Sequence, residues 1–457
     1  MRRHRRVTSN LQRGPDQPTP NGAGTTLAPK KDFSHAWRAL KHRNFRLYFG
    51  GQSISLIGTW MTRIATSWLV YRLTGSALLL GIVGFAGQIP TFIFASFAGV
   101  WVDRLNRRHV LVVTQALAML QSLALAVLTL AKVITIQEIV VLSAFQGLIN
   151  AFDMPGRQSF MVHMVEDRQD LGNAIAINSS MVNLAQLIGP SIAGIVIAGV
   201  GEGYCFLIDG LSYIAVIASL LLMRMPALVI HRQVSSMLSQ FKDGWTYVSE
   251  SAPIRSILYI FALIGLMGWP YMVLMPIFAG KVLKGGPSTL GFLMAAVGIG
   301  ALASGITLAA RRTVVGLDRR IAIGSIALGT GLVLFAASRV LWVSMLLMLA
   351  TGFGLMQVTT ICNTLIQTVV PEEKRGRVMG YYTMAFVGMA PFGSLLAGSL
   401  ARLVGAPLTL AINGVCCVAG GIWFATLVKS IRAVMHPIFV DLGILSPEVV
   451  GILEDQV

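Results

Sequence analysis

The chain has 457 residues, of which 55% are hydrophobic and only 12% are charged. This composition excludes a soluble enzyme with one large core, because apolar runs of about 20 residues recur along nearly the whole chain, as in helical membrane proteins. A formal net charge of +17 would suggest nucleic acid as the partner of a soluble protein, but the positions of the basic residues exclude nucleic acid here.

Twelve apolar runs are long enough to cross a bilayer as helices. We expect them at residues 47–72, 77–101, 109–131, 137–160, 172–200, 204–223, 254–280, 289–310, 321–338, 342–368, 376–402 and 407–429. With both termini in the cytoplasm, 29 of the 36 lysines and arginines fall on the inner side and six on the outer side. Because short basic loops stay inside, the bias predicts an all-α, multi-pass membrane protein with both termini cytoplasmic.

The chain divides into five regions. Residues 1–35 are rich in Arg, Pro and Gly, which predicts a disordered, basic cytoplasmic tail. Two six-helix bundles are expected at 36–225 and 253–430, with a cytoplasmic linker at 226–252 between them and a cytoplasmic tail at 431–457.

The first span carries a polar stripe. Gln52, Ser55, Thr59 and Arg63 recur every three or four residues, which places them on one face of a helix. In lipid this face would be costly, so it faces protein or a water-filled cavity. An arginine near the centre of a span costs about 2.5–3.5 kcal/mol on insertion scales. We therefore interpret Arg63 as a ligand for anionic or catechol-like cargo; the alternative is a structural arginine bound to backbone carbonyls.

A short basic loop separates the second and third spans. Its sequence is G-x-x-x-D-R-x-x-R-R, from Gly99 through Asp103 and Arg104 to Arg107 and Arg108. We expect Asp103 to bind Arg107 or a neighbouring helix end, so that the loop forms part of an inner gate. The alternative is a solvated loop that only sets the topology.

Spans four and ten carry similar polar stripes. Span four contains Gln146, Asn150, Asp153 and Arg157, each three or four residues apart, and span ten contains Gln357, Asn363 and Gln367. Stripes on the first and fourth helices of one bundle and the fourth helix of the other predict a central aqueous cavity. Hydrogen bonds between packed helices would explain each stripe as well.

Span five contains Gly189-Pro190 followed by Gly194. Small residues allow close helix approach, and proline removes a backbone donor, so the motif predicts a helix bend. An internal repeat extends the pattern, because a shift of 204 residues aligns Gly189 with Gly393 and Gly194 with Gly398. A parallel repeat of two six-helix halves is one recurring transporter design.

Several stretches carry a family resemblance over about residues 36–430. The loop motif G-x-x-x-D-R-x-x-R-R resembles the loop between helices two and three of the major facilitator superfamily. The stretches ALKHRNFRLYFGGQSIS, WLVYRLTGSALLLG, NAFDMPGRQSF, NAIAINS and PEEKRGRVMG resemble the branch that contains the enterobactin exporter and macrolide-efflux-like proteins.

The resemblance implies a twelve-helix secondary transporter of the bacterial inner membrane. Its expected cargo is a siderophore, a drug or another small amphipathic or hydrophobic metabolite, exported by alternating access in exchange for protons. It also implies a monomer in contact with membrane lipids. An uptake permease, or the membrane subunit of an ATP-driven transporter, is the alternative.

Proton exchange requires an ionisable residue at the depth of the cavity. Within the spans only Asp153 and Asp209 qualify. Asp153 shares the polar face of Gln146 and Asn150 and is our first candidate, although Arg157 one turn away favours its charged form. Asp209 is the second candidate, because span six is peripheral in the family fold.

No enzyme chemistry is expected. The four cysteines, Cys205, Cys362, Cys416 and Cys417, lack metal-ligand spacing with histidine. The spans contain no paired carboxylates and no nucleophile next to a base, and the chain has no phosphate-binding G-x-x-x-x-G-K-[ST] loop. We therefore expect no cofactor and no metal.

Overall fold

The computed structural model describes residues 38–161, 163–165, 167–224, 237–311, 313 and 316–441, and within these ranges the regular structure is entirely helical. The fold confirms the all-α class. The expected N-terminal tail and most of the expected C-terminal tail lie outside the described residues.

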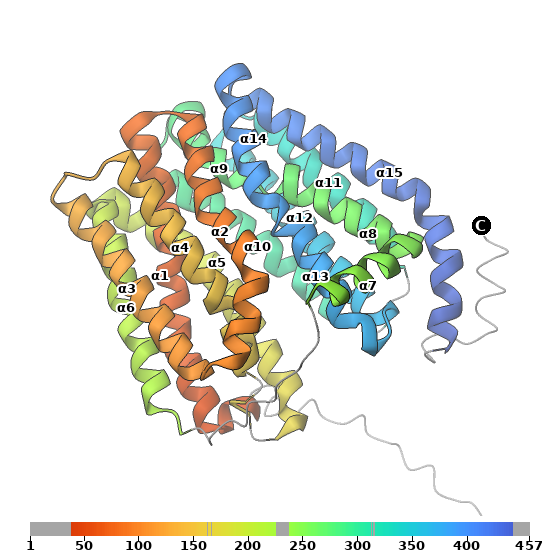
Figure 1. The fold of residues 1–457 in the computed structure, drawn as a ribbon. Helices are drawn as coiled ribbons and strands as arrows, with labels where there is room; N and C mark the ends of the chain where they lie inside the picture. Colours follow the sequence, from red (N-terminus) through yellow and green to blue (C-terminus); the bar gives the residue numbers. More distant parts are fainter. Residues whose placement is uncertain are drawn as a thin grey trace, which may run out of the picture.

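The N-terminal half, here called the N-half, consists of α1 to α6. Its helices are α1 (Arg43–Thr74), α2 (Ala77–Arg104), α3 (Arg107–Leu130), α4 (Ile136–Met161), the short η2 (Arg168–Asp170), α5 (Leu171–Val200) and α6 (Glu202–Leu222). Within the N-half, α1 packs on α5 and α6, α4 packs on α2 and α3, and α3 packs on α6. The six helices therefore form one bundle (Figure 1).

The C-terminal half, or C-half, consists of α8 to α15, and α7 precedes it. The elements are α7 (Met237–Glu250), α8 (Ala252–Leu263), η3 (Ile264–Gly268), α9 (Tyr271–Ile277), η4 (Phe278–Val282), α10 (Pro287–Ala309), α11 (Leu317–Ala337), α12 (Leu341–Val369), α13 (Glu372–Phe386), α14 (Met389–Val404) and α15 (Ala406–Asp441). The helix α12 packs on α10 and α11, and α11 packs on α15.

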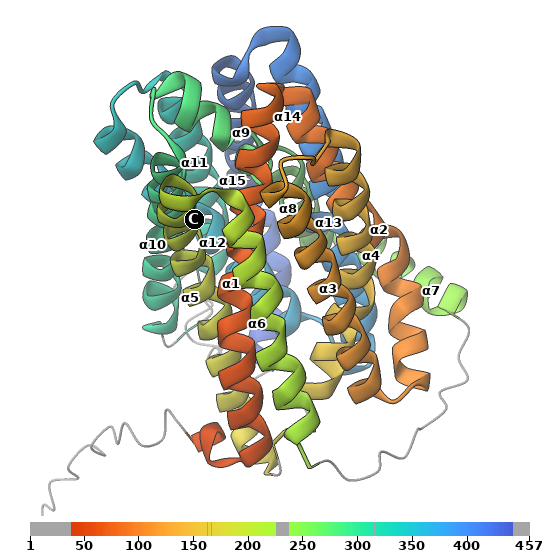
Figure 2. The same cartoon turned by 90° about the vertical axis from the view of Figure 1, so that its left-hand side faces the viewer.

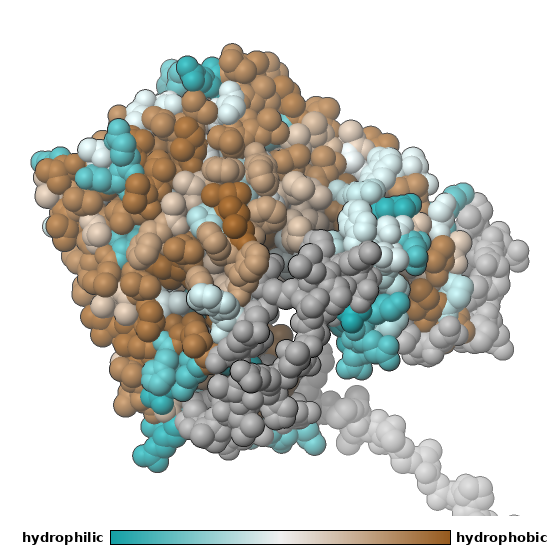
Figure 3. Space-filling view, in the orientation of Figure 1, coloured by the Kyte–Doolittle hydropathy of each residue, from teal (hydrophilic) through white to brown (hydrophobic). Residues whose placement is uncertain are grey.

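Eleven helical stretches of the described chain are long and apolar enough to cross a membrane. The helix α1 is the twelfth span: its polar stripe lowers its mean hydropathy, but it lies alongside α5 and α6, which both qualify. A mostly hydrophobic surface covers the bundle, interrupted by hydrophilic residues near its ends (Figure 3). Apolar side chains on that surface are the expected contacts with lipid tails.

Three spans differ from the sequence-based prediction. The eleventh, expected to be continuous over 376–402, is interrupted at 387–388 between α13 and α14. The seventh, expected to be continuous over 254–280, is divided by π-helical turns at Ile264–Gly268 and Phe278–Val282 and by the pair Trp269-Pro270. Proline removes a backbone donor, and π-turns re-pair the freed groups. The last helix continues to Asp441 rather than ending near 429, because apolar side chains along the extension are buried.

We call the end of the molecule where α2 meets α3 and where α6 ends the basic end, and the other the opposite end. The two halves meet through α2 with α14 and through α5 with α10 (Figure 2). A Cβ added to Gly194 would lie 2.9 Å from the Pro287 carbonyl oxygen and 3.0 Å from the Cα of Gly291. One added to Gly81 would lie 2.9 Å from the Cα of Gly398. Only glycine permits helices to approach this closely, and all these positions lie toward the opposite end.

The rest of the predicted helix-bend motif belongs to the same contact region. Pro190 lies inside the continuous helix α5. A Cβ added to Gly189 would lie 2.5 Å from the Cβ of Trp60 and 3.0 Å from the carbonyl oxygen of Ile57 in α1. Gly189 therefore allows α5 to pack against α1 at the level where α5 also meets α10.

Toward the basic end, α5 and α10 separate. Ser179 and Ser180 continue the face of α5 that carries Pro190, and both are exposed. On the matching face of α10, Leu302 is 39% and Ile306 is 62% exposed. The halves are thus joined at the opposite end and apart at the basic end.

Candidate cargo and proton sites

Arg63 lies on α1 between two packed faces. One face, through Gly58 and Thr62, meets α6, and another, through Trp60, meets α5. Arg63 is on neither face. Its side chain is exposed, and within the described residues it forms no hydrogen bond and no ion pair. Arg63 therefore lies on a part of α1 that neither α5 nor α6 covers.

The guanidinium of Arg63 lies 4.5 Å from the centre of the Trp60 ring. A cation over an aromatic face is held by the ring quadrupole without using any of its N–H donors. Five donors in a planar fork remain available, and this arrangement matches a carboxylate or another planar anion. The pair Arg63–Trp60 is therefore equipped to bind an anionic group next to an apolar one.

The remaining members of the α1 stripe differ in exposure. Gln52 and Ser55 are 3% and 1% exposed, so both are packed inside the protein rather than facing open space in this conformation. Thr59 is half-buried, donates to the Ser55 carbonyl at 3.0 Å and lies 3.4 Å from the Tyr213 hydroxyl of α6. Of these three residues, Thr59 has a polar contact with a neighbouring helix, as expected for hydrogen bonding between packed helices.

The stripe on α12 divides in the same way. Gln357 is 3% exposed and donates to Thr307 of α10 at 3.3 Å, so it is packed between helices rather than facing open space. Almost three turns on, Gln367 is exposed and donates to the half-buried Asn363 at 2.7 Å. Asn363 and Gln367 remain open to bind a polar ligand.

On α4 the polar side chains face two directions. Gln146 donates to Asn150 at 3.2 Å, and both are half-buried. Asp153 is 4% exposed and accepts from Gln115 of α3 at 2.7 Å, while its other oxygen pairs with Arg157. Asp153 is thus part of a local ion pair directed at α3.

Asp209 has a different environment. It is 2% exposed, and its Oδ2 accepts from Thr62 of α1 at 2.8 Å and from Ser122 of α3 at 3.1 Å. Its Oδ1 has no hydrogen-bond partner, and no basic side chain of the described chain pairs with it. A Cβ at Gly58 would lie 2.7 Å from that Oδ1, so only glycine leaves room for it. The carboxyl group therefore joins three helices without a countercharge.

The basic loop lies at the junction of α2 and α3. The side chains of Asp103 and Arg104 are outside what the structure describes, so the expected bond of Asp103 is not placed. Arg107 lies 2.9 Å from Nε2 of His163, between α4 and α5, and Arg108 donates to the Leu221 carbonyl at 2.6 Å. Gly99 has space around it, with Pro155 nearest at 4.0 Å from an added Cβ. Burial, and then the charge of Arg107, lower the pKa of His163.

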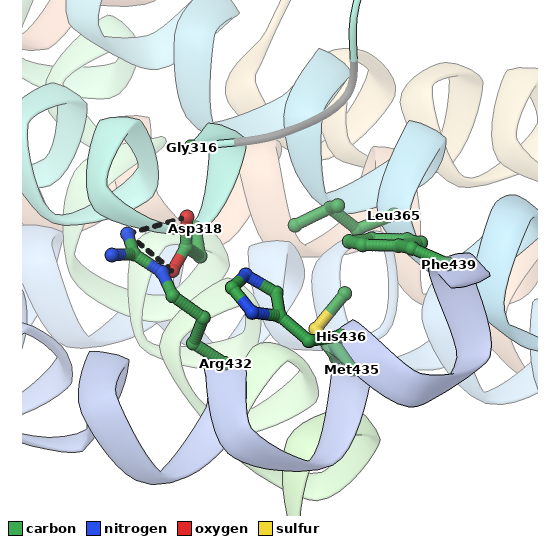
Figure 4. Close-up of a pocket in the computed structure, with 7 residues that line it drawn as sticks. All are labelled: Gly316, Asp318, Leu365, Arg432, Met435, His436 and Phe439. Carbon is green, nitrogen blue, oxygen red and sulfur yellow. Dashed lines mark hydrogen bonds and ion pairs between the residues drawn. The ribbon is translucent and has the colours of Figure 1, made fainter. Parts of the chain in front are cut away.

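Sequence reasoning missed an ion pair at the basic end of the C-half. Asp318, in the first turn of α11, pairs with Arg432 of α15 at 3.0 Å (Figure 4). Around the pair is a small pocket lined by Gly316, Leu365, Met435, His436 and Phe439. The signal was present: Asp318 directly precedes the basic pair Arg319-Arg320. The pair and the buried Met435 and Phe439 hold the extension of α15 against α11 and α12.

Metal chemistry has no site in the part of the chain that the structure describes. No group of three His, Cys, Asp or Glu side chains there could hold a metal ion. All four cysteines are free, and three of them are buried. What the arrangement offers is an unpaired cation, a few open amides and buried carboxyl groups.

Comparisons with known proteins identify related transporters. The staphyloferrin A transporter of Staphylococcus aureus is 25% identical over 81% of this chain and 92% of its own length. The multidrug efflux pump Tap of Mycolicibacterium fortuitum is 27% identical over 76% of this chain and 87% of its own. Among solved structures, the nucleoside transporter NupG superposes with a TM-score of 0.67 at 13% identity, covering 85% of this chain and 99% of that one.

The profile of the transmembrane secretion effector family matches residues 34–435, which is most of the chain. Homologous members are transporters and not enzymes. The chain therefore belongs to the transmembrane secretion effector family of the major facilitator superfamily and is a bacterial multi-pass membrane transporter of small molecules.

Proposed function

We propose that this protein exports small anionic, amphipathic molecules from the bacterial cytoplasm by alternating access, in exchange for protons. The observation that carries the proposal is Arg63, an exposed guanidinium over Trp60 that pairs with no other side chain of the described residues. We infer that it faces the space between the halves, because an unpaired charge facing lipid is unfavourable. A positive charge at this position would not attract a cationic or neutral cargo, and its insertion within a span costs about 2.5–3.5 kcal/mol.

The orientation of the basic end supports entry of the cargo from the cytoplasm. The excess of lysine and arginine assigns that end, with both termini, to the cytoplasm. The halves are apart at this end and in contact through Gly194 and Gly291 at the other. Cargo then enters from the cytoplasm and leaves after the halves rock about the site between them.

The relatives support export and the chemical range of the cargo. They include a staphyloferrin A transporter, a multidrug efflux pump and a macrolide efflux protein of Streptococcus pyogenes that is 19% identical over 59% of this chain. A siderophore, drug or hydrophobic metabolite that carries a carboxylate or a catecholate fits Arg63 and Trp60 together. The open amides of Asn150, Asn363 and Gln367 add hydrogen bonds.

Asp209 is the favoured proton carrier on structural grounds, ahead of Asp153. Asp153 has Arg157 and two further donors, so its charged form is stabilised from several sides. Asp209 has no countercharge and one oxygen without a partner, and a buried carboxylate in that position is costly unless it takes up a proton. This reverses the order that the sequence suggested.

The basic loop completes the proposal. Gly99, Asp103, Arg104, Arg107 and Arg108 lie where α2, α3 and the α4–α5 connection meet, at the expected membrane surface. Arginines there can bind lipid phosphates and stabilise one arrangement of the gate. We also propose that the working unit is a monomer in its lipid bilayer.

Dye efflux from cells that express the protein tests the choice of cargo. Cells are loaded with anionic carboxyfluorescein or with cationic ethidium, and loss of each dye is followed. We expect Arg63→Gln to slow carboxyfluorescein export by about tenfold or more, the loss of one charged hydrogen-bonding group, and Arg63→Lys to retain part of it. Arg402→Gln, the same charge change at an exposed position of α14, is the matched control. Equal export by Arg63→Gln and the control would contradict the assignment.

The natural cargo is identified by untargeted metabolite analysis of knockout and overexpressing cells. We expect an anionic compound to accumulate inside knockout cells and in the medium of overexpressing cells. Accumulation inside overexpressing cells would instead indicate the uptake alternative.

Two further experiments test coupling and topology. In proteoliposomes, Asp209→Asn should transport cargo without dependence on an imposed pH gradient, whereas Asp153→Asn should keep that dependence. For topology, single cysteines replace Leu105 at the basic end and Val133 at the opposite end, which are 52% and 58% exposed. A membrane-impermeant thiol reagent applied to intact cells should label position 133 and not position 105.

A further inference from the structure

The hydroxyl group of Thr62 connects the two candidate sites. Thr62 donates to Asp209 at 2.8 Å, and the next residue in the chain is Arg63. Successive residues of a helix are rotated by about 100°, so α1 presents Thr62 to α6 and Arg63 to the space between the halves. We propose that Thr62 is a positioning residue, through which the charge of Asp209 sets the placement of Arg63 and Trp60. The inference rests on the proposed function, since it assigns a coupling route between the proton site and the cargo site.

The contact of Asp209 with α1 is specific and close. Besides the Thr62 bond, Oδ1 points at the backbone of Gly58, one turn earlier on α1. The same helix approaches α6 closely at Gly51, where an added Cβ would lie 2.7 Å from the Ser219 hydroxyl. At Gly51 and Gly58 the backbone of α1 therefore lies directly against side chains of α6, and at Gly58 one of these is the carboxyl group of Asp209, so that a small change there acts on the backbone of α1.

The two charge states of Asp209 act differently on this contact. A carboxylate accepts a charge-assisted hydrogen bond that is roughly twice as strong as the bond to a neutral acid. When Asp209 takes up a proton, the hydrogen bond that it accepts from Thr62 weakens. The added hydrogen needs space or an acceptor, beside Gly58 if it is on Oδ1 and beside the hydroxyls of Thr62 and Ser122 if it is on Oδ2. The position of α1 relative to α6 then differs between the two states, and Arg63 and Trp60 move with α1.

No neighbour of Asp209 among the described residues has an ordinary pKa near neutral pH, so none of them is expected to change its charge there. On α6 the titratable groups near it are the Cys205 thiol and the Tyr213 phenol, whose ordinary pKa values lie well above neutral pH. From α3 it meets the hydroxyl of Ser122, and from α1 it meets Thr62 and Gly58. A pH-dependent change of α1 at this level therefore reports Asp209.

The experiment uses Trp60 as an internal probe and needs no cargo. The full-length protein is labelled with 5-fluorotryptophan, and the ¹⁹F resonance of Trp60 is assigned by its absence in Trp60→Phe. We expect this resonance to shift with pH in the wild type and to be constant in Asp209→Asn. Thr62→Val, which keeps the shape and removes the hydroxyl, should lose most of the shift, and Thr62→Ser should restore it.

Two controls separate coupling from structure. Ser122→Ala removes a donor to the same oxygen from α3, so the Trp60 shift should persist with a displaced midpoint. In Thr62→Val, the infrared band of a protonated carboxyl should still appear on acidification, which shows that Asp209 still titrates. If Thr62→Val folds poorly, Thr62→Ala serves in its place.

The proposal is overturned if the ¹⁹F resonance of Trp60 does not shift with pH in the wild type. It is also overturned if this resonance shifts with pH in Thr62→Val or Thr62→Ala as it does in the wild type. Failure of the proposed export function has a separate signature, since it would appear as unchanged dye efflux in Arg63→Gln while the Trp60 titration is unaffected.

Discussion

Replacing Gly194 with valine should open the contact between α5 and α10. An added Cβ at Gly194 would lie 2.9 Å from the Pro287 carbonyl oxygen, 3.0 Å from the Cα of Gly291 and 3.2 Å from the Cα of Ser288. All three atoms belong to the backbone, so no side chain can rotate away. Carbon atoms at rest are about 3.5–4.0 Å apart, and the two helices must therefore separate by about 0.5 Å or more.

The cost falls only on the state in which the opposite end is closed. Overpacking of a close contact costs about 1–3 kcal/mol, and a difference of that size changes the ratio of two conformations by about 5- to 150-fold. Gly194→Val should therefore increase the fraction of molecules that are open at the opposite end. The matched control is Gly199→Val in the same helix, where an added Cβ would meet nothing within 4 Å.

Distances between spin labels measure this change after the four native cysteines have been replaced. One label pair, at Val133 and Val340, reports the opposite end, where these residues are 58% and 56% exposed. Another pair, at Leu105 and Ala310, reports the basic end. In Gly194→Val we expect longer distances in the first pair and shorter ones in the second. Distributions identical to those of Gly199→Val would refute the reasoning.

Three further outcomes follow from single contacts. Burial and the charge of Arg107 lower the pKa of His163 from 6.5. The stability that this neutral imidazole contributes is therefore present above pH 6.5 and is lost as the pH falls through the lowered pKa. His163→Gln should make the unfolding temperature depend less on pH between about pH 7 and 5. Asp318→Asn leaves Arg432 without its carboxylate and should cost about 1–3 kcal/mol, seen as a lower unfolding temperature with dye selectivity unchanged. Gln357→Leu should also leave dye selectivity unchanged, and altered selectivity would return Gln357 to the cavity.

The membrane spans could be predicted from the sequence because length and hydropathy are local properties. The span expected at 289–310 is α10, Pro287–Ala309, and the span expected at 342–368 is α12, Leu341–Val369. The first span was found despite its polar stripe, since its ends are marked by basic residues and by Gly75. The break of the seventh span was not predicted, because prolines and glycines within a membrane helix allow either a kink or a continuous helix.

The site residues were harder to predict because a helical stripe shows which residues share a face but not what that face meets. Gln52 and Gln357 belong to stripes that also contain exposed members, yet both are buried against a neighbouring helix. Asp153 receives a hydrogen bond from Gln115, 38 residues away, and Asp318 pairs with Arg432, 114 residues away. Such partners depend on the packing of separate helices, which local periodicity does not contain.

The internal repeat shows how the two halves differ in chemistry. Gly189 meets Ile57 and Trp60 of α1, and its counterpart Gly393 meets Leu266 and Pro270 of the seventh span. In the N-half, the position that packs on this glycine is thus an aromatic residue beside Arg63. In the C-half, the equivalent position is the proline that follows a π-helical turn.

At the shift of 204 residues, Arg63 corresponds to Met267 and Asp209 to Asn413, which is 2% exposed. Both proposed charged sites therefore occur in the N-half alone. In the C-half the matching residues are uncharged, and the seventh span, which matches α1, is divided by π-helical turns. A transporter needs a place that binds charged ligands and a place where the backbone changes direction. The residues that pack against the matching glycines Gly189 and Gly393 therefore differ in chemistry, with Trp60 three residues before Arg63 in the N-half and Pro270 next to a π-helical turn in the C-half.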